Sequence, residues 1–300
     1  MMTELPLDQV RTLLAVVDEG TFDAAAAALH VTPSAVSQRV KALEQRTGRV
    51  LLLRTKPVRP TESGAVLVRF ARQLARLERD ARGELGMSGA GEQTRVSVAV
   101  NADSLATWFL GALTRVPGLC FELHREDEAH TAALLREGLV MAAVTSSPDP
   151  VPGCSVRALG RMRYLPVAAP EFAARHLDGP LRDTLPQAPV VVFDTKDEFQ
   201  DAFVRRLGGR GAGPLRHQVP TSEGFVATVA AGLGWGMVPE VQAAPLLREG
   251  RLVTLGATGP GAPEQWVEIT LYWQQWKLDS PALAALAEAV AQTAAETLRG

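Results

Sequence analysis

Cysteine is scarce in this sequence of 300 residues, which contains only Cys120 and Cys154. We interpret them as isolated thiols and not as part of a disulfide framework. No cluster of cysteine and histidine has the spacing of a zinc site, so we expect no metal and no cofactor. The sequence also lacks an apolar run approaching ~18 residues, and its N-terminus lacks the pattern of a signal peptide. We therefore expect a cytoplasmic protein that does not associate with membranes.

A strong charge of one sign is also missing, because the formal net charge of the chain is only -2. The charges are nevertheless unevenly distributed. Residues 37–59 contain seven basic side chains and one acidic one, whereas residues 91–300 contain 18 basic and 23 acidic ones. This asymmetry predicts that the N-terminal part contacts phosphate groups. The length and the 46% hydrophobic content indicate two globular domains with a connector.

The first fifty residues have the pattern of three short helices. Apolar side chains recur at helical spacing over residues 7–17. A second helix follows the capping residue Thr21 and contains an alanine run, which allows two helices to approach closely. Thr32-Pro33 predicts the start of a third helix, because a capping hydroxyl precedes proline at the first helical position. This helix is expected to end near Arg46.

The third helix has the polar surface expected of a DNA-recognition helix. Short polar side chains lie near its start, and amides and cations follow, which suits contacts to base edges surrounded by phosphate contacts. A short strand at residues 50–54 and a basic turn at residues 55–60 resemble a wing that reaches phosphates or the minor groove. Any small helical domain can have a polar face and a basic loop, but this order of features favours a winged helix-turn-helix. The predicted DNA-binding residues are Thr32, Pro33, Ser34, Ser37, Gln38, Lys41, Arg54, Lys56 and Arg59.

Residues 61–90 predict a connecting helix and a glycine-containing hinge. Apolar side chains recur with a seven-residue repeat, which is typical of a two-stranded coiled coil and predicts a dimer interface. The residues of this seam are Leu67, Phe70, Leu74 and Leu77. The helix also carries Arg69, Arg72, Arg76, Arg79 and Arg82, which lie mainly off the seam and are expected to be solvated. The alternative is a single helix that packs on its own domain.

From residue 95 onward the pattern alternates between strands and helices. We expect strands at 96–100, 120–126, 139–145, 189–193, 218–221, 235–238 and 267–273. We expect helices at 103–115 and 129–137, around Phe199, Val226 and Leu246, and at 280–298. This order predicts an α/β architecture with largely parallel strand pairing.

Polar residues follow several of these strands at the positions where ligands bind in open α/β sheets. Hydroxyl groups at helix starts suit a carboxylate, and acids suit an ammonium or guanidinium group, so the set predicts an amino acid with a cationic side chain. Each residue by itself is better explained as a helix cap, but the set favours a site. The predicted effector-binding residues are Asp103, Ser104, Thr107, Trp108, Glu126, Asp127, Thr145, Asp194, Thr221 and Glu223.

Residues 22–44 resemble the signature of LysR-type transcriptional regulators, and residues 51–54 and 60–64 continue the resemblance. In that family the base-contacting positions correspond to Ser34, Ser37 and Gln38, and an arginine of the wing corresponds to Arg54. Residues 98–108, 221–225 and 271–273 resemble the lysine- and arginine-responsive ArgP/LysG group.

This resemblance implies an all-α winged helix-turn-helix head, a linker helix and an α/β effector domain with two lobes similar to periplasmic binding proteins. The implied divisions are 1–60 for the head, 61–90 for the linker and hinge, and 91–300 for the effector domain. Lobe I would comprise about 91–165 and 266–300, and lobe II about 166–265. The implied partners are double-stranded operator DNA, lysine or arginine as effector, further copies of the chain in a homodimer or homotetramer, and RNA polymerase. The implied function is control of genes for export or metabolism of basic amino acids; the alternative is a regulator of this type with a different effector.

Two other classes of protein fit the sequence less well. The basic head and the lack of an export signal disfavour a stand-alone solute-binding protein. An enzyme is disfavoured because the sequence has no nucleophile elbow, P-loop or metal motif. The glycine-rich run at residues 232–236 does not have a dinucleotide-binding fingerprint and is better explained by tight packing beside a strand.

Overall fold

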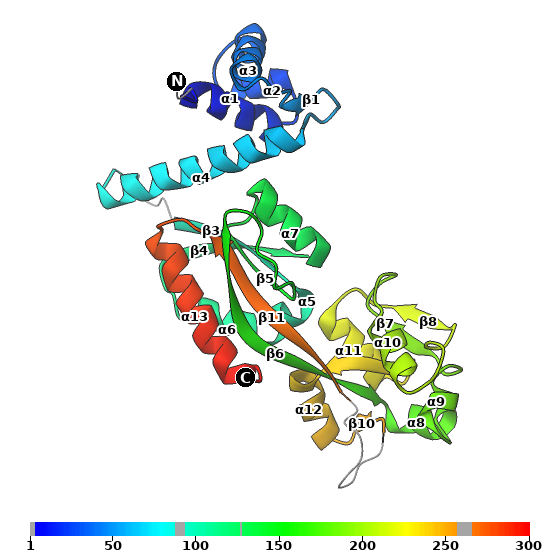
Figure 1. The fold of residues 1–300 in the computed structure, drawn as a ribbon. Helices are drawn as coiled ribbons and strands as arrows, with labels where there is room; N and C mark the ends of the chain where they lie inside the picture. The colour runs from blue at the N-terminus through cyan, green and yellow to red at the C-terminus, as the bar shows by residue number, and fades with distance from the viewer. Residues whose placement is uncertain (1–3, 88–93, 127, 257–265) are drawn as a thin grey trace.

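The computed structural model describes residues 4–87, 94–126, 128–256 and 266–300, and it consists of a small head, a long helix and a larger domain (Figure 1). The head contains α1 (Leu7–Asp18), α2 (Phe22–Ala28), α3 (Pro33–Thr47), β1 (Leu52–Leu53) and β2 (Arg59–Pro60). The linker helix α4 (Glu62–Glu84) follows directly. The predicted order of a helical head, a short wing and a connecting helix is confirmed.

Local capping explains where the helices of the head begin and end. The hydroxyl of Thr21 accepts a hydrogen bond from the backbone N–H of Ala24 at 3.1 Å, and Thr32 accepts one from Ala35 at 3.2 Å. These bonds satisfy donors that the first turn of a helix leaves without a partner. At its other end, α3 stops at Gly48, whose φ of 65° is in the left-handed region that glycine adopts readily.

The linker helix contacts both the head and the larger domain. It packs on α1 of the head and on α7 (Glu128–Glu137) of the larger domain. Arg76 was expected in solvent, but its side chain is only 3% exposed. Its guanidinium group donates to the carboxylate of Asp80 and to the backbone carbonyl of Arg95, at the start of the larger domain. The prediction for Arg76 was wrong because the seven-residue pattern describes one seam and does not show that a second face of the helix is covered.

The larger domain is built on a mixed sheet with the strand order β10-β6-β11-β5-β3-β4, and β9 also pairs with β6. Its strands are β3 (Thr94–Val100), β4 (Leu119–Arg125), β5 (Ala142–Thr145), β6 (Cys154–Ala168), β9 (Gly236–Pro239), β10 (Val253–Thr254) and β11 (Val267–Trp276). β3 is parallel to β4 and β5, whereas β11 is antiparallel to β5 and β6. β9 and β10 are also antiparallel to β6. The prediction of largely parallel pairing was therefore wrong.

Two long strands, β6 and β11, connect two lobes (Figure 1). We call β3, β4 and β5 with their helices lobe I, and the elements from α8 to β10 lobe II. Lobe I contains α5 (Ala102–Ser104), η1 (Leu105–Phe109), α6 (Leu110–Leu113), α7 and α13 (Pro281–Thr297). Lobe II contains α8 (Pro170–His176), α9 (Leu181–Thr184), β7 (Val190–Val192), α10 (Phe199–Arg206), β8 (Arg216–Gln218), α11 (Ser222–Ala230), β9, α12 (Glu240–Arg248) and β10.

The helix predicted at residues 103–115 is present, but a π-helical turn, η1, interrupts it. Single π-helical turns occur often near functional sites, because they change the direction in which side chains point. Among the described helices, none combines the length and the apolar character that crossing a bilayer requires.

Candidate functional site

The predicted recognition helix α3 presents its polar face to solvent. Val36, Val40 and Leu43 are at most 1% exposed and pack into the core of the head. Every predicted DNA-binding residue of this helix and its cap is exposed: Thr32, Pro33, Ser34, Ser37, Gln38 and Lys41. The face that reaches solvent is therefore rich in hydroxyl and amide groups, which are the groups that contact base edges.

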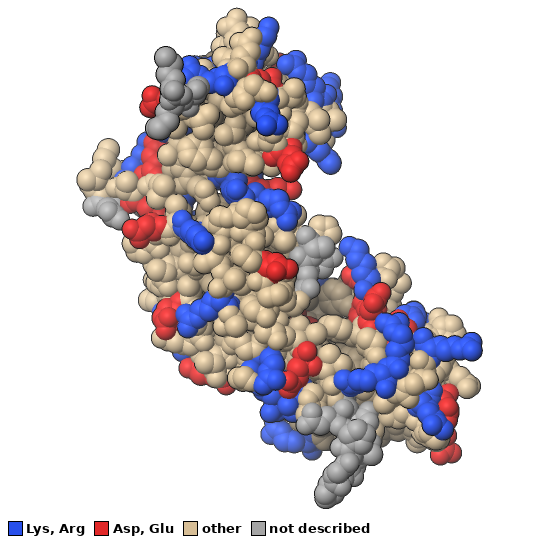
Figure 2. Space-filling model, in the orientation of Figure 1, with Lys and Arg blue, Asp and Glu red and all other residues tan. Residues whose placement is uncertain are grey.

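The predicted wing is a turn between the paired strands β1 and β2. Arg54, Lys56 and Arg59 are exposed there. The guanidinium carbon of Arg54 lies 5.6 Å from the centroid of the Phe22 ring, so a cation–π contact ties the wing to α2. Figure 2 shows basic side chains gathered on the edge of the head where Figure 1 places β1. This surface has the charge needed to contact phosphates.

The predicted dimerisation residues lie along one face of the linker helix. Phe70 is 38% exposed and Leu77 is 41% exposed, whereas Leu67 and Leu74 are half-buried. Leu67 packs against the core of the head. A partially exposed row of large apolar side chains is compatible with burial against another helix.

Several polar residues of the larger domain converge where the carboxyl ends of β3 and β4 face lobe II. Asp103 follows β3, and its carboxylate is the centre of this cluster. Its Oδ2 accepts a hydrogen bond of 2.8 Å from the hydroxyl of Tyr164 on β6. Its Oδ1 accepts one of 2.7 Å from the hydroxyl of Ser222, the first residue of α11. A second contact between the lobes is a hydrogen bond from Arg125 to the backbone carbonyl of Pro220.

The environment of Asp103 acts on its charge in opposite directions. Burial raises the pKa of the Asp103 carboxyl, and repulsion by Asp197 and Glu223 acts in the same direction. The hydrogen bonds from Ser222 and Tyr164 lower the pKa, because they stabilise the ionised form. A buried carboxylate with a raised pKa in a polar cluster is typical of a functional site.

Three other predicted residues lie on the turns that follow Asp103. Thr107 donates to the backbone carbonyl of Asp103 at 2.6 Å. Ser104 and Trp108 are buried, and within the described part of the chain the Ser104 hydroxyl and the Trp108 Nε1 have no hydrogen-bond partner. Buried polar groups normally have partners, so these two could serve a bound polar ligand.

The remaining predicted effector residues are spread more widely. Thr145 is buried, and its hydroxyl accepts from the backbone N–H of Ser147 at 3.1 Å. Asp194 accepts from the backbone N–H of Lys196 at 2.7 Å, which is a turn-forming role. Thr221 and Glu223 are exposed, and Thr221 makes no side-chain cap on α11.

Two acids that follow β4 complete this set. Glu126 is half-buried, and its backbone N–H donates to the carbonyl of Val100 at 3.3 Å, which continues the pairing of β4 with β3. Asp127 lies outside the described residues.

The sequence pattern did not identify Tyr164, Ser222 and Asp197 as site residues. Asp197 lies in the loop before α10, and its carboxylate accepts from the backbone N–H groups of Phe193 at 2.7 Å and Phe199 at 3.1 Å. Burial raises the pKa of Asp197. Ser222 directly follows Thr221. The expectation that a hydroxyl at the start of a helix binds the ligand therefore selected Thr221, the neighbour of the residue whose hydroxyl contacts Asp103.

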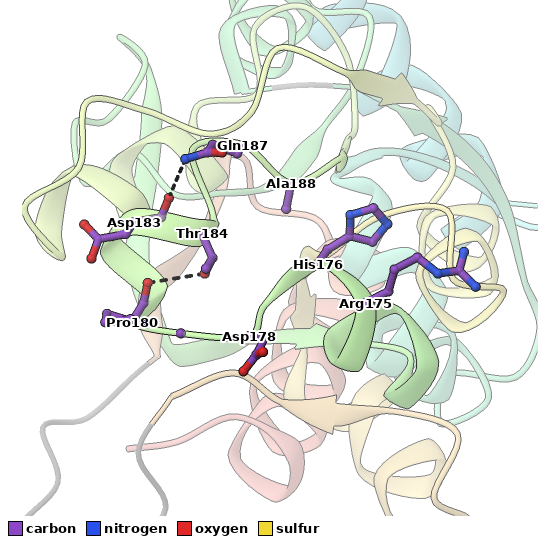
Figure 3. Close-up of a pocket in the computed structure, with 9 residues that line it drawn as sticks. Arg175, His176, Asp178, Pro180, Asp183, Thr184, Gln187 and Ala188 are labelled. Atoms are coloured by element: carbon purple, nitrogen blue, oxygen red, sulfur yellow. Dashed lines mark hydrogen bonds between the residues drawn. The ribbon is translucent and has the colours of Figure 1, made fainter.

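A pocket elsewhere in lobe II does not gather any of the predicted residues (Figure 3). It has a volume of about 420 Å³ and lies between α8 and α9, at the end of lobe II distant from lobe I (Figure 1). The hydrogen bonds of its polar side chains stay within the α9 segment, from Thr184 to Pro180 and from Gln187 to Asp183. The lobe junction at Asp103 is therefore the stronger candidate for a ligand site.

Comparison with known proteins gives matches to both parts of the chain. The helix-turn-helix family of bacterial regulatory proteins named after lysR matches residues 7–65, and the LysR substrate binding domain matches residues 89–295. The lysine export transcriptional regulatory protein LysG of Corynebacterium glutamicum is 44% identical over 299 residues, which cover 97% of this chain and 98% of that protein.

Two solved structures are similar over almost the whole chain. The crystal structure of ArgP from Mycobacterium tuberculosis has a TM-score of 0.89 and 46% identity, and the match covers 97% of this chain and 98% of that one. Full-length LysG from Corynebacterium glutamicum with bound effector arginine has a TM-score of 0.84 and 42% identity, with coverage of 98% and 100%.

Proposed function

The chain belongs to the LysR family of bacterial transcriptional regulators, and from this premise we propose that it regulates genes of basic amino acid export or metabolism in response to arginine or lysine. The observation that carries the effector half of this proposal is the buried carboxylate of Asp103 at the junction of the two lobes. A carboxylate in such a position suits a ligand with an ammonium or guanidinium group. The similarity to an arginine-bound relative and to a lysine export regulator supports the same class of effector.

For DNA recognition, we assign base contacts to Ser34, Ser37 and Gln38, because these side chains are short, polar and exposed near the start of α3. We assign the contacts to the DNA backbone to the cationic residues and to the residues at the start of α3. These residues are Thr32, Pro33, Lys41, Arg54, Lys56 and Arg59. The basic edge of the head in Figure 2 supports this division of roles.

For the effector, the proposed site extends from Asp103 along the turns that carry Ser104, Thr107 and Trp108. The partnerless hydroxyl of Ser104 and the indole N–H of Trp108, within the described part of the chain, support their inclusion as donors to the effector's carboxylate. The further members are Glu126, Asp127, Thr145, Asp194, Thr221 and Glu223.

We also propose where the chain acts and which molecules it contacts. The chain would act in the cytoplasm, where the bacterial chromosome lies, as a regulator without catalytic activity. Two copies of the chain would pair through the apolar row of α4, which consists of Leu67, Phe70, Leu74 and Leu77. The product would be a dimer, or a tetramer that contains two such dimers. Contact with RNA polymerase would follow binding upstream of a promoter.

The test uses the full-length protein, calorimetry and DNA from upstream of its own gene. Arginine and lysine should bind with heat release, and citrulline, whose side chain replaces guanidinium with an uncharged urea, should bind at least tenfold more weakly. Asp103→Asn should remove most of the arginine affinity, whereas Asp279→Asn, at an exposed position, should not. Gln38→Ala should weaken binding to this DNA more than to unrelated DNA.

Two outcomes would contradict the proposal. Wild-type protein that binds neither arginine nor lysine would remove the effector class. Protein that binds its upstream DNA no better than unrelated DNA, with or without these amino acids, would remove the assigned role of the head.

A further inference from the structure

The Asp103 carboxylate is held by one hydroxyl from each side of the lobe junction. Tyr164 reaches it from β6, and Ser222 reaches it from the start of α11 in lobe II. Both donors are nearly buried, with Tyr164 5% and Ser222 4% exposed. The two hydrogen bonds end on different oxygens, so together they fix the plane of the carboxylate as well as its position.

The hydroxyl of Ser222 has one proton and two acceptor contacts within reach. Asp103 Oδ1 lies at 2.7 Å and Gln242 Oε1 at 3.1 Å. A charged acceptor at the shorter distance takes the proton. Gln242 can then satisfy the Ser222 oxygen by turning its NH₂ group toward it, since the two ends of an amide have the same shape. This gives a chain of donors from Gln242 through Ser222 to Asp103.

Tyr164 is positioned by its ring as well as by its hydroxyl. The ring centroid lies 5.1 Å from that of Phe199, the first residue of α10. This contact and the burial of the ring leave the hydroxyl aimed at Asp103 Oδ2. An ionised carboxylate offers about four acceptor positions. The hydrogen bonds from these two hydroxyls take two of these positions, one on each oxygen, which leaves acceptor capacity on the carboxylate for a ligand.

These hydrogen bonds oppose the burial and the repulsion that act on the carboxylate. Burial, Asp197 in the loop before α10 and Glu223 on α11 favour the protonated form, whereas the two hydroxyls favour the ionised form. A neutral carboxylic acid attracts a cation far less than a carboxylate does. The hydroxyls therefore fix the direction of the group and oppose the loss of its charge on burial.

We propose that Tyr164 and Ser222 are positioning residues that orient Asp103 and keep it ionised for the cationic group of the effector, and that Ser222 makes this state depend on contact between the lobes. The inference rests on the proposed function, because it assigns a role within the same site. It adds two residues outside the predicted set, and it connects effector affinity to the approach of α11 toward lobe I.

The experiment measures arginine affinity of full-length protein by calorimetry between about pH 5 and pH 8, in the wild type, Tyr164→Phe and Ser222→Ala. Arginine keeps its charge throughout this range. In the wild type, affinity is constant at high pH and falls about tenfold per pH unit below the pKa of Asp103. Loss of either hydroxyl raises that pKa further, so the fall should begin at higher pH in both variants.

Matched controls separate positioning from a general effect on folding. Tyr272→Phe removes the hydroxyl of the other tyrosine in the chain, on β11, and Thr228→Ala removes a hydroxyl from α11 that donates to the carbonyl of Gly224. Both should keep the wild-type pH profile. Tyr164→Phe and Ser222→Ala should at the same time keep the wild-type circular dichroism spectrum.

The result that overturns the inference is a wild-type pH profile in Tyr164→Phe and Ser222→Ala while the wild type binds arginine. A uniform loss of affinity at all pH values, without a displaced profile, also overturns it, because it indicates a structural role alone. Absence of arginine binding in the wild type is a different outcome and contradicts the proposed function itself.

Discussion

Replacement of Arg76 by methionine should make the linker helix open more often from the larger domain, without unfolding the rest of the chain. Arg76 Nε lies 2.9 Å from Oδ1 of Asp80 on the same helix, and Nη1 donates to the carbonyl of Arg95 on β3, so the second contact joins the helix to the larger domain. The side chain is 3% exposed, and Asp80 is 16% exposed. Methionine keeps much of the apolar stem, so the main change is loss of the charge and of its hydrogen bonds.

The size of the effect follows from the burial of the two partners. Removal of one member of a buried ion pair costs about 3–5 kcal/mol, because the other charge stays buried without a partner. Asp80 retains some contact with water, so we expect the lower end, about 3 kcal/mol. A factor of ten in an equilibrium constant corresponds to about 1.4 kcal/mol, so local opening should become roughly 150-fold more frequent.

Amide hydrogen exchange measures this opening directly. Protection of the amides of α4 and of β3 near Arg95 should fall by roughly that factor in Arg76→Met, while β7 and β8 in lobe II should be unaffected. Arg79→Met is the matched control, because Arg79 is exposed on the same helix. Equal protection in Arg76→Met and Arg79→Met would refute the claim that the buried guanidinium fastens the helix to the domain.

Three further predictions concern the head and a buried thiol. Arg54→Ala should reduce the slope of log affinity for DNA against log salt by about 0.9, as measured by fluorescence anisotropy, and an unchanged slope would mean that Arg54 does not neutralise a phosphate. Gly64→Ala should lower the melting temperature of the head, because an added Cβ would lie 1.9 Å from the carbonyl oxygen of Leu51; a wild-type melting curve would contradict this. Burial raises the pKa of the Cys154 thiol to about 11, so it should resist a thiol reagent at pH 8 until the chain unfolds, and rapid labelling of the folded protein would be inconsistent with its burial.

The head was predictable because the contacts that form it are short in sequence. In the head, α2 and α3 each begin at a hydroxyl that accepts from an N–H three residues later, at Thr21 and Thr32, and the linker helix begins in the same way at Thr61. The end of α3 coincides with Gly48, which adopts the left-handed conformation. These features are visible in any window of four residues, and the apolar spacing between them then determines which face is buried.

Of the two long strands of the larger domain, β11 was expected at residues 267–273, but β6 was not predicted. β6 has 15 residues and an exposed stretch near its start, and the sequence pattern did not identify it. Its partner β11 pairs Val267 with Tyr164 and Trp276 with Cys154, more than a hundred residues apart. Pairing of this kind depends on the whole fold, and the four consecutive exposed residues near the start of β6 do not show the alternation of buried and exposed positions by which a half-buried strand is recognised.

The candidate site combines a residue that the local sequence predicts with contacts that depend on the whole fold. Asp103 was identified from sequence because it lies just after a buried strand, at the start of a helix. The same rule gave equal weight to Asp194 and Glu223, and it had no means of ranking them. What distinguishes Asp103 is the pair of donors, and these are 61 and 119 residues away along the chain. One arrives on β6, the strand that was not predicted, and the other on α11 from the opposite lobe.

A site assembled in this way has a physical consequence for regulation. The carboxylate belongs to lobe I, but part of what favours its ionised form belongs to lobe II, so the strength with which it attracts a cation varies with the distance between the lobes. Binding of a cation in turn favours the ionised carboxylate and hence the hydrogen bond from Ser222, which draws the lobes together. Linkage requires these two effects to be equal in free energy, so an effector that gains affinity from lobe contact must also stabilise that contact. An amino acid with an uncharged side chain gains no side-chain attraction from the ionised state of Asp103, and it should therefore draw the lobes together less than arginine does, even at concentrations that fill the site.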